Sequence, residues 1–333
     1  MARQTTPTQK TKIHPDNYAD AILTADNHLS PRIPRCRNEE EFLTAMFKKL
    51  DFIANLQKRH GGIPVLSAGD ITDRWFIDKG EQWFVTAIIK RMHNWIAIPG
   101  QHDLPQHSLE LYDKSLLALL EEAGCIKVIM SNDVPELAGF PWGVEPTKVA
   151  PGGLAKCVAL IHRMTYVGKP PYPGAENDGG TAKELMQKMK GFDLIVSGDN
   201  HETFMHKGAK QTGHIKDKEG NKWAGYDWDG SWLVNPGSMM RTSAKQIDHE
   251  PCVFLWYAST NTVERVVLPH QKDVVSREHL EAAEARDERL DAFVESLEGR
   301  IDLSVGFREN VMTRLRETEV SAETEAVVME VLG

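Results

Sequence analysis

The sequence predicts an α/β layered fold, with central mixed β-sheets flanked by helices and a helical tail at the C-terminus. Two observations carry this prediction. As far as residue 198, short apolar runs typical of buried strands alternate with segments whose apolar residues recur at helical spacing. From Ser231 to His270 the pattern changes to three strand-like runs separated by turn residues, which indicates antiparallel strands that complete a sheet.

In the first 130 residues the predicted elements alternate regularly. Residues 21–25 (AILTA) form the first strand, and residues 39–59 form a helix because Phe42, Met46 and Leu50 fall on one helical face. The paired glycines that follow end this helix. The next elements are a strand at 63–68, a helix over about 79–93, a strand at 95–100, a helix over 108–124 and a strand at 126–130.

The alternation of strands and helices continues until the antiparallel strands that complete the sheet. A strand at 157–161 precedes a helix over 181–191, which Gly191 closes, and a strand at 193–198. The three antiparallel candidates are 231–237, 251–259 and 262–270. We therefore expect a lead-in at 1–19, a main domain at 20–272 and a helical tail at 273–333.

From about residue 274 the tail is expected to form helices with a high density of charged residues. One narrow apolar stripe would consist of Leu280, Leu290, Phe293, Val294 and Leu297. Ser321 is a candidate N-cap for a last helix over 322–332.

Composition excludes several classes of protein. No apolar run approaches the ~18–20 residues that span a bilayer, and the N-terminus has no apolar signal segment, so we expect no membrane contact. Four scattered cysteines without a C-x-x-C pair indicate reduced thiols and a cytoplasmic location, that of the host if the protein is viral. Residues 271–333 hold 8 Lys and Arg against 16 Asp and Glu, leaving 31 and 32 for residues 1–270, so the acidity lies in the tail.

Acidic, histidine or amide residues follow five of the predicted strands. The five stretches are ADNH (25–28), AGDITDR (68–74), PGQHD (99–103), LIHR (160–163) and SGDNH (197–201). Ligands of open α/β sheets bind at the carboxyl ends of the strands, so these side chains are expected to meet there. Asp and His without thiolates suit Mn²⁺, Fe or Zn²⁺, and two such ions ~3.5–4 Å apart can clamp a phosphoryl transfer.

Each stretch alone also has a structural interpretation. Asp70 and Asp73 could form a turn with an N-cap, and His162 could be a core histidine. Trp75 is better explained by packing than by substrate contact. The lysine-rich segment 206–222 is either a solvated hairpin or a loop that contacts the phosphate backbone of nucleic acid.

Taken in order, the five stretches resemble the signature of calcineurin-like metallophosphoesterases: D-x-H, G-D-x-x-D, G-N-H-D, a lone His after a strand, and G-H-x-H. The resemblance covers about residues 20–270, and a later NPGS at 235–238 resembles the closing turn of that family. It implies a metallophosphoesterase fold with two divalent metal ions.

The resemblance also implies a role for each matching residue. Asp26, His28 and His201 would bind one metal, and Asp70 would bridge to the second. The remaining ligands and supporting residues would be Gln101, His162 and Asp199 on the second metal, His102 as the catalytic histidine, Asp103 to orient it, and Asp73 and Arg74 behind the ligands.

The sequence departs from the family pattern at two ligands. Gln101 stands where the family usually has Asn, and Asp199 stands where it usually has His. Both offer oxygen, so the second metal site should be harder and richer in oxygen. We therefore expect Mn²⁺ as the metal, with Mg²⁺, Fe and Zn²⁺ as alternatives.

Within this family the sequence most resembles the SbcD-type nuclease subunit of DNA repair and recombination complexes, bacterial or viral. The resemblance rests on G-x-H-D before a long helix, on DLIVSG, on N-P-G-S-x-x-R and on the helical tail. It implies a Mn²⁺-dependent DNA exo- or endonuclease, whose partners would be DNA, an SbcC-type ATPase subunit or a second copy of the chain.

Two alternatives remain open. A phosphatase or phosphodiesterase for small phosphoesters fits the nearly neutral main domain, which has no basic stripe. A non-catalytic subunit that binds an ATPase through its acidic tail fits the two departures at the ligands.

Overall fold

A computed structural model describes residues 18–37, 42–130, 136–147, 156–208, 211–212, 227–228, 230–278, 286–287, 289, 306–317 and 320–332. The described chain divides into two compact units. The first consists of residues up to 33, 39–241 and 246–272, and the second of 34–38, 242–245 and 273 onward. The expected lead-in up to residue 17, most of the lysine-rich segment and the tail stripe at 280 and 290–297 lie outside the described residues.

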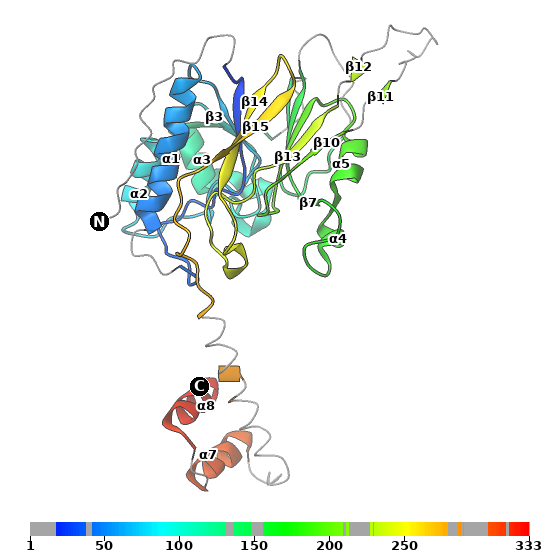
Figure 1. Ribbon diagram of the computed structural model, residues 1–333. Helices are drawn as coiled ribbons and strands as arrows, with labels where there is room; N and C mark the ends of the chain where they lie inside the picture. Colours follow the sequence, from blue (N-terminus) through cyan, green and yellow to red (C-terminus); the bar gives the residue numbers. More distant parts are fainter. Residues whose placement is uncertain are drawn as a thin grey trace, which may run out of the picture. The chain divides into compact units, whose positions relative to one another are not determined.

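Two mixed β-sheets form the centre of the first unit (Figure 1). The six-stranded sheet is ordered β15 (Thr262–Val267), β14 (Cys252–Tyr257), β1 (Ala21–Thr24), β2 (Val65–Ser67), β3 (Trp95–Ala97) and β4 (Ile126–Val128). The five-stranded sheet is ordered β10 (Phe204–Lys207), β13 (Trp232–Asn235), β9 (Leu194–Gly198), β6 (Val158–His162) and β5 (Leu137–Phe140). In each sheet four neighbouring strands run parallel, and the strands beyond them run antiparallel.

Helices cover the outer faces of both sheets, as expected for the α/β layered fold. Those of the first unit are α1 (Phe42–Arg59), α2 (Gln82–Ile89), α3 (Leu116–Glu122), α4 (Ala175–Asp178) and α5 (Ala182–Lys188), and those of the second are α7 (Phe307–Glu317) and α8 (Ala322–Leu332). Short elements complete the described chain: η2 (Pro105–His107), η3 (Leu109–Lys114), η4 (Ala244–Gln246), β7 (Met164–Tyr166), β8 (Gly179–Thr181), β11 (Gln211–Thr212) and β12 (Asp227–Trp228). None of the described helices has the length and hydropathy that a membrane crossing requires.

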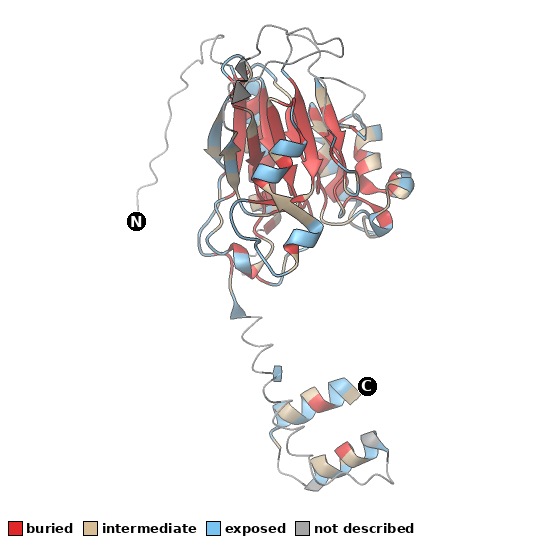
Figure 2. Cartoon of the chain, turned by 90° about the vertical axis from the view of Figure 1, so that its right-hand side faces the viewer, coloured by how far each residue is buried: buried red, intermediate tan, exposed pale blue. Residues whose placement is uncertain are grey.

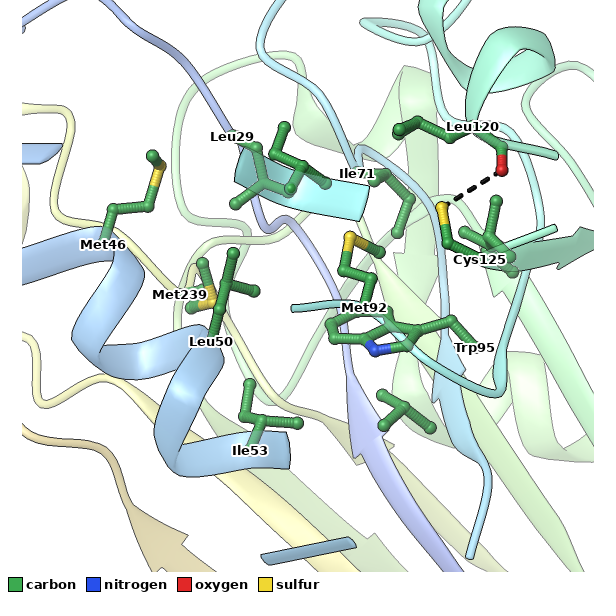
Figure 3. Packing of buried hydrophobic residues seen from close by; sticks show 14 of the residues in the cluster. Leu29, Met46, Leu50, Ile53, Ile71, Met92, Trp95, Leu120, Cys125 and Met239 are labelled. Carbon is green, nitrogen blue, oxygen red and sulfur yellow. Dashed lines mark hydrogen bonds between the residues drawn. The ribbon is translucent and has the colours of Figure 1, made fainter. Parts of the chain in front are cut away.

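The inner strands of both sheets are buried on both faces, which explains their continuous apolar runs (Figure 2). In β1, Leu23 belongs to the cluster that lies between the two sheets, whereas the adjacent Ile22 packs in the cluster beneath α1 to α3. Met46, Leu50 and Ile53 of α1 point into that second cluster (Figure 3). A third cluster lies on the outer face of the five-stranded sheet, under α5. The four layers are therefore helix, sheet, sheet and helix.

The prediction of one continuous helix over 108–124 is wrong. The chain forms the 3₁₀ turn η3 and then α3, with an extended residue, Ser115, between them. The Ser115 hydroxyl accepts a hydrogen bond from the backbone N–H of Ala118 at 3.0 Å, so it caps α3 and ends the preceding turn. Apolar spacing alone cannot detect this break, because η3 and α3 share one buried side.

The two last helices of the second unit, α7 and α8, pack through a small apolar cluster. It contains Val311, Leu315, Val320, Val328 and Leu332. Ser321 receives a hydrogen bond from the N–H of Thr324 at 3.2 Å, as expected of the N-cap of α8.

Candidate metal centre

The carboxyl ends of β1, β2, β3, β6 and β9 meet at one place and bring the five polar stretches together. In the six-stranded sheet Thr24 pairs with Ser67, and in the other sheet His162 pairs with Gly198. Hydrogen bonds join the ends of the two sheets; in one of them the N–H of Asp199 donates to Oδ1 of Asp26 at 2.9 Å. Residues far apart in the chain therefore face one another across the end of the sandwich.

The backbone bends sharply at four of these residues. Asp26, His28, Asp70 and Asp199 have φ of 46°, 44°, 49° and 80°, in the left-handed region that residues with a side chain seldom adopt. Such strain costs about 1–3 kcal/mol per residue and persists where the surrounding structure enforces it. Here it turns each side chain toward the common centre immediately after its strand ends.

One group of donors consists of Asp26, His28 and His201, whose ligand atoms all lie within 4.8 Å of one another. Nε2 of His28 and Nε2 of His201 are 3.0 Å apart. Two ring nitrogens that face each other at this distance offer adjacent lone pairs in their neutral forms, which a cation between them can use.

A second group joins Asp26 and Asp70 to His162. Nδ1 of His162 donates to the carbonyl oxygen of Ala68 at 2.7 Å, which fixes the tautomer and directs Nε2 into the site. Nε2 lies 2.6 Å from Oε1 of Gln101, and the amide nitrogen of Gln101 donates to Oδ1 of Asp199 at 2.8 Å. The structure thus places Gln101, His162 and Asp199 side by side.

Burial and mutual charge shift the pKa values of the two carboxylates in opposite directions. Burial raises the pKa of Asp26 to about 8, against the opposing charge of His162. Burial acts in the same direction on Asp70, but the charge of His162 and the close polar contact with that ring outweigh it and hold the pKa of Asp70 below its usual value.

The pKa values of the histidines also shift in opposite directions. Burial lowers the pKa of His28 to about 3, and it also lowers the pKa of His201, so both rings are neutral. Burial alone would lower the pKa of His162, yet Asp70 and Asp26 raise it to about 10. The position next to Nε2 of His162 therefore favours positive charge, whether a proton or a metal cation supplies it.

The unsatisfied atoms of the site fit a bound cation. Among the described residues, Oδ2 of Asp26, Oδ2 of Asp70 and Nδ1 of His28 are buried and accept or donate no hydrogen bond. Oδ2 of Asp70 has an ion-pair contact with Nε2 of His162 at 3.4 Å. Leaving buried carboxylate oxygens without a hydrogen-bond donor is costly, and a coordinated metal removes that cost. Carboxylate, imidazole and amide donors without thiolate suit Mn²⁺, Mg²⁺, Fe or Zn²⁺.

His102 lies on the exposed rim of the cluster. Its ring is 4.8 Å from that of His28, and its backbone N–H donates to Oδ1 of Asp70 at 2.9 Å. Nδ1 donates to the carbonyl oxygen of Asp73 at 2.9 Å, so Nε2 remains free for another group. Burial would lower the pKa of His102, but the charge of Asp70 and the bond to Asp73 raise it.

Asp103 does not orient His102 in the way that we expected. Its buried carboxylate accepts hydrogen bonds from the N–H groups of Ile71, Thr72 and Gly100 and from the hydroxyl of Thr72, at 2.8–3.2 Å. Asp103 therefore ties the loop after β2 to the loop after β3. The bond that orients His102 comes from a backbone carbonyl, which no sequence motif reveals.

The two expected supporting residues differ in their contacts. Oδ1 of Asp73 lies 3.8 Å from Nδ1 of His28, close to the first donor group. Arg74 instead forms ion pairs with Asp78 and Glu81, each at 3.1 Å. Arg74 thus stabilises its own loop and contacts no donor of the cluster by a hydrogen bond or ion pair that the described residues show.

Two glycines allow the loops to approach this closely. A Cβ on Gly100 would lie 2.2 Å from Oδ1 of Asp70, and one on Gly198 would lie 2.3 Å from the carbonyl oxygen of Ala68. No side chain fits at either position without moving a donor or the group that orients it.

The sequence assigned no role at the site to Asn235 or His249, which hold the loop that follows β9. The buried amide of Asn235 donates to the carbonyl oxygens of Asn200 and Glu202, at 2.6 and 2.8 Å. Nε2 of His249 lies 2.7 Å from the carbonyl oxygen of Ser238, whose N–H donates to the carbonyl of His201. The NPGS motif signals the first of these contacts, whereas nothing in the sequence signals His249.

A comparison with known families identifies the family of the chain. The family model described as calcineurin-like phosphoesterase matches residues 21–203, more than half of the chain. No curated protein matches the sequence. Among solved structures, the crystal structure of TT1561 of Thermus thermophilus aligns over 76% of this chain and 100% of its own, with 12% identity and a TM-score of 0.41.

Proposed function

Because the chain belongs to the calcineurin-like phosphoesterase family, we propose that it is a DNA nuclease of SbcD type that hydrolyses phosphodiester bonds with two divalent cations. Membership of the family implies metal-dependent hydrolysis of phosphoesters. The specificity for DNA and the identity of the metal are the parts that we propose.

The observation that carries the proposal is the contrast between a buried donor cluster and an open rim. Asp26, Asp70 and His162 are at most 2% exposed, whereas His102 lies at the exposed edge of the cluster. A phosphate within a polymer can approach from that edge without entering a closed cavity, which suits a nucleic-acid backbone.

In this proposal the donor groups divide between two cations. Asp26, His28 and His201 would hold one, and Asp70 would contribute to both. Gln101, His162 and Asp199 would complete the second site. The cations supply Lewis-acid chemistry, since they lower the pKa of water and offset the charge that develops on the phosphoryl oxygens.

His102 is the group that we assign to the leaving oxygen. The bond from its Nδ1 to the carbonyl of Asp73 fixes the ring, and its free Nε2 can contact the phosphate or donate a proton to the leaving group. The backbone N–H of His102 holds Asp70 at the same time, so one loop positions both the histidine and the bridging carboxylate.

We propose Mn²⁺ as the metal. Oε1 of Gln101 lies 2.6 Å from Nε2 of His162, and Oδ1 of Asp199 accepts a hydrogen bond from the amide nitrogen of Gln101 at 2.8 Å, so both residues bring an oxygen to the second site. Oxygen ligands favour Mn²⁺ and Mg²⁺ over Zn²⁺.

The resemblance of the motifs around the site to those of SbcD-type nucleases favours DNA over small esters. The N-P-G-S-x-x-R motif ends in Arg241, which is buried and donates to the carbonyls of Ile247 and Lys272 at 3.2 and 3.1 Å, so it fixes the end of the first unit. The helix pair α7 and α8 follows in the second unit. We propose that this tail binds an SbcC-type ATPase subunit or a second copy of the chain.

A small-molecule phosphodiesterase is the second candidate, favoured by the absence of net positive charge over residues 1–270. The test is hydrolysis of linear duplex and single-stranded DNA with Mn²⁺, beside bis-p-nitrophenyl phosphate, by wild type and His102→Ala. Cutting of DNA that His102→Ala abolishes is the expected result. Hydrolysis of only the small diester would transfer the function to the second candidate, and turnover of neither would indicate a non-catalytic subunit.

A further inference from the structure

Two aromatic side chains stand exposed on the loop that anchors His102. Trp75 is 37% exposed and Phe76 is 38% exposed, although packing was the expected role of Trp75. Large aromatic rings gain little by lying in water, and neighbouring exposed rings mark binding surfaces more often than isolated ones do.

The position of the pair connects it with the hydrolytic site. The carbonyl of Asp73, two residues before Trp75, accepts the hydrogen bond from Nδ1 of His102. Consecutive Cα atoms are about 3.8 Å apart, so the Cα of Trp75 lies within about 7.6 Å of that of Asp73. A phosphodiester at His102 would therefore bring its neighbouring substituents into reach of the rings.

The rings are held in place despite their exposure. The carbonyl of Trp75 accepts a hydrogen bond from the N–H of Leu116 at 2.6 Å, which fixes the backbone of the loop. The Trp75 and Phe76 rings are 4.9 Å apart and tilted by 59°. The guanidinium of Arg74 lies 4.8 Å from the centre of the Phe76 ring, and its ion pairs with Asp78 and Glu81 hold it there. Because Arg74 already contacts Phe76, the indole of Trp75 is the freer stacking surface.

We propose that Trp75 stacks on an unpaired nucleobase next to the phosphodiester that is cut, with Phe76 as its support. This inference rests on the proposed nuclease function and narrows its substrate to a single-stranded segment of nucleic acid. A base in the interior of a duplex has both faces covered by its neighbours, whereas an unpaired base can present a face to the indole.

Local charge favours stacking over phosphate contact at this point. Arg74 is paired with two carboxylates, so it offers little charge to a phosphate. Every base has an aromatic face, and base–aromatic stacking contributes to binding without reading sequence. Stacking can therefore supply affinity in a main domain that has no basic stripe.

The test compares how the protein binds a strand that carries bases with how it binds the same strand without them. The probes are a fluorescein-labelled oligothymidylate and the same strand with tetrahydrofuran abasic units, measured by anisotropy with Ca²⁺ and by cutting with Mn²⁺. The proteins are the full-length wild type, Trp75→Ala, Trp75→Phe and the control Trp83→Ala. Trp83 is 50% exposed, and its ring contacts Phe84 of α2.

We expect Trp75→Ala to weaken binding of oligothymidylate about tenfold, which is the effect of losing one stacked base. Its affinity for the abasic strand should stay within about twofold of that of wild type. Trp75→Phe should keep most of the preference for bases, and Trp83→Ala should match wild type. An equal loss on both strands would overturn the inference, because it would show displacement of His102 and not loss of a stacked base. If wild type binds DNA but cuts none, the nuclease proposal fails, while the comparison of binding still decides whether Trp75 stacks.

Discussion

Gly100→Ala should disable the metal centre although it adds only one methyl group. The new Cβ would lie 2.2 Å from Oδ1 of Asp70, 2.5 Å from its backbone nitrogen and 2.8 Å from its Cγ. Contacts under 3.0 Å essentially never occur for a Cβ, so Asp70 or the loop must move by about 0.8 Å. Side-chain rotation cannot relieve the clash, because one of the three atoms belongs to the backbone.

The displacement should affect both proposed metal sites and His102. Oδ1 of Asp70 accepts the backbone N–H of His102, and the N–H of Gly100 itself donates to Asp103. Forcing an extra methyl into a packed site costs typically 1–3 kcal/mol of unfolding free energy, and a misplacement near 1 Å can cost about 100-fold in rate. We expect that loss in hydrolysis of bis-p-nitrophenyl phosphate, with fewer than two Mn²⁺ bound per chain by elemental analysis.

The matched control is Gly306→Ala in the second unit, where the nearest atom would be 3.9 Å from the new Cβ and the backbone has no positive φ. Circular dichroism and thermal unfolding separate a folded, inactive protein from an unfolded one. Wild-type turnover and full metal loading in Gly100→Ala would refute the assignment of Asp70 to the centre of the site.

Four further outcomes are expected. His102→Ala should lower DNA cutting by about 10²–10⁴-fold while elemental analysis still finds bound metal, because the proposal assigns His102 to the leaving group; loss of metal would contradict this role and would favour the donor group of His28, Asp70 and His102. Replacing both Gln101→Asn and Asp199→His should raise the affinity for Zn²⁺ relative to Mn²⁺ in competition titrations, since an imidazole replaces a carboxylate; an unchanged ratio would mean that these side chains do not set the preference. Asp103→Ala should lower the unfolding free energy in urea by about 2–4 kcal/mol, because buried donors from two loops lose their acceptor; a change under about 0.5 kcal/mol would refute that role. EDTA should lower the melting temperature and Mn²⁺ should restore it, whereas an unchanged melting temperature would mean that no metal is bound tightly to the folded state.

Sequence patterns predicted most of the strands and the layered fold because burial on both faces demands continuous apolar runs. The same patterns did not predict β5, β7 or β8, which are short and contain glycine or polar residues. They also merged η3 with α3, since apolar spacing continues across the cap at Ser115. Local propensity fails where a single side chain-to-backbone bond decides the conformation.

The donor residues were recognisable in the sequence because metal chemistry restricts which side chains can occur there, and because each follows a strand. Asp26, His28, Asp70, His162 and His201 needed only their residue type and their order to be singled out. Their distances, the positive φ angles that aim them and the neutral or charged state of each ring depend on burial, which arises only when the two sheets pack together.

The tertiary structure alone decided the contacts that involve the backbone. The carbonyl of Asp73 orients His102 and the carbonyl of Ala68 orients His162, yet every residue carries the same carbonyl group and no motif marks these two. The exposure of Trp75 is equally invisible in sequence, because an indole suits a core and a binding surface alike. Residue chemistry determined which side chains could hold a metal, whereas packing determined which backbone atoms orient them and which aromatic rings stay exposed.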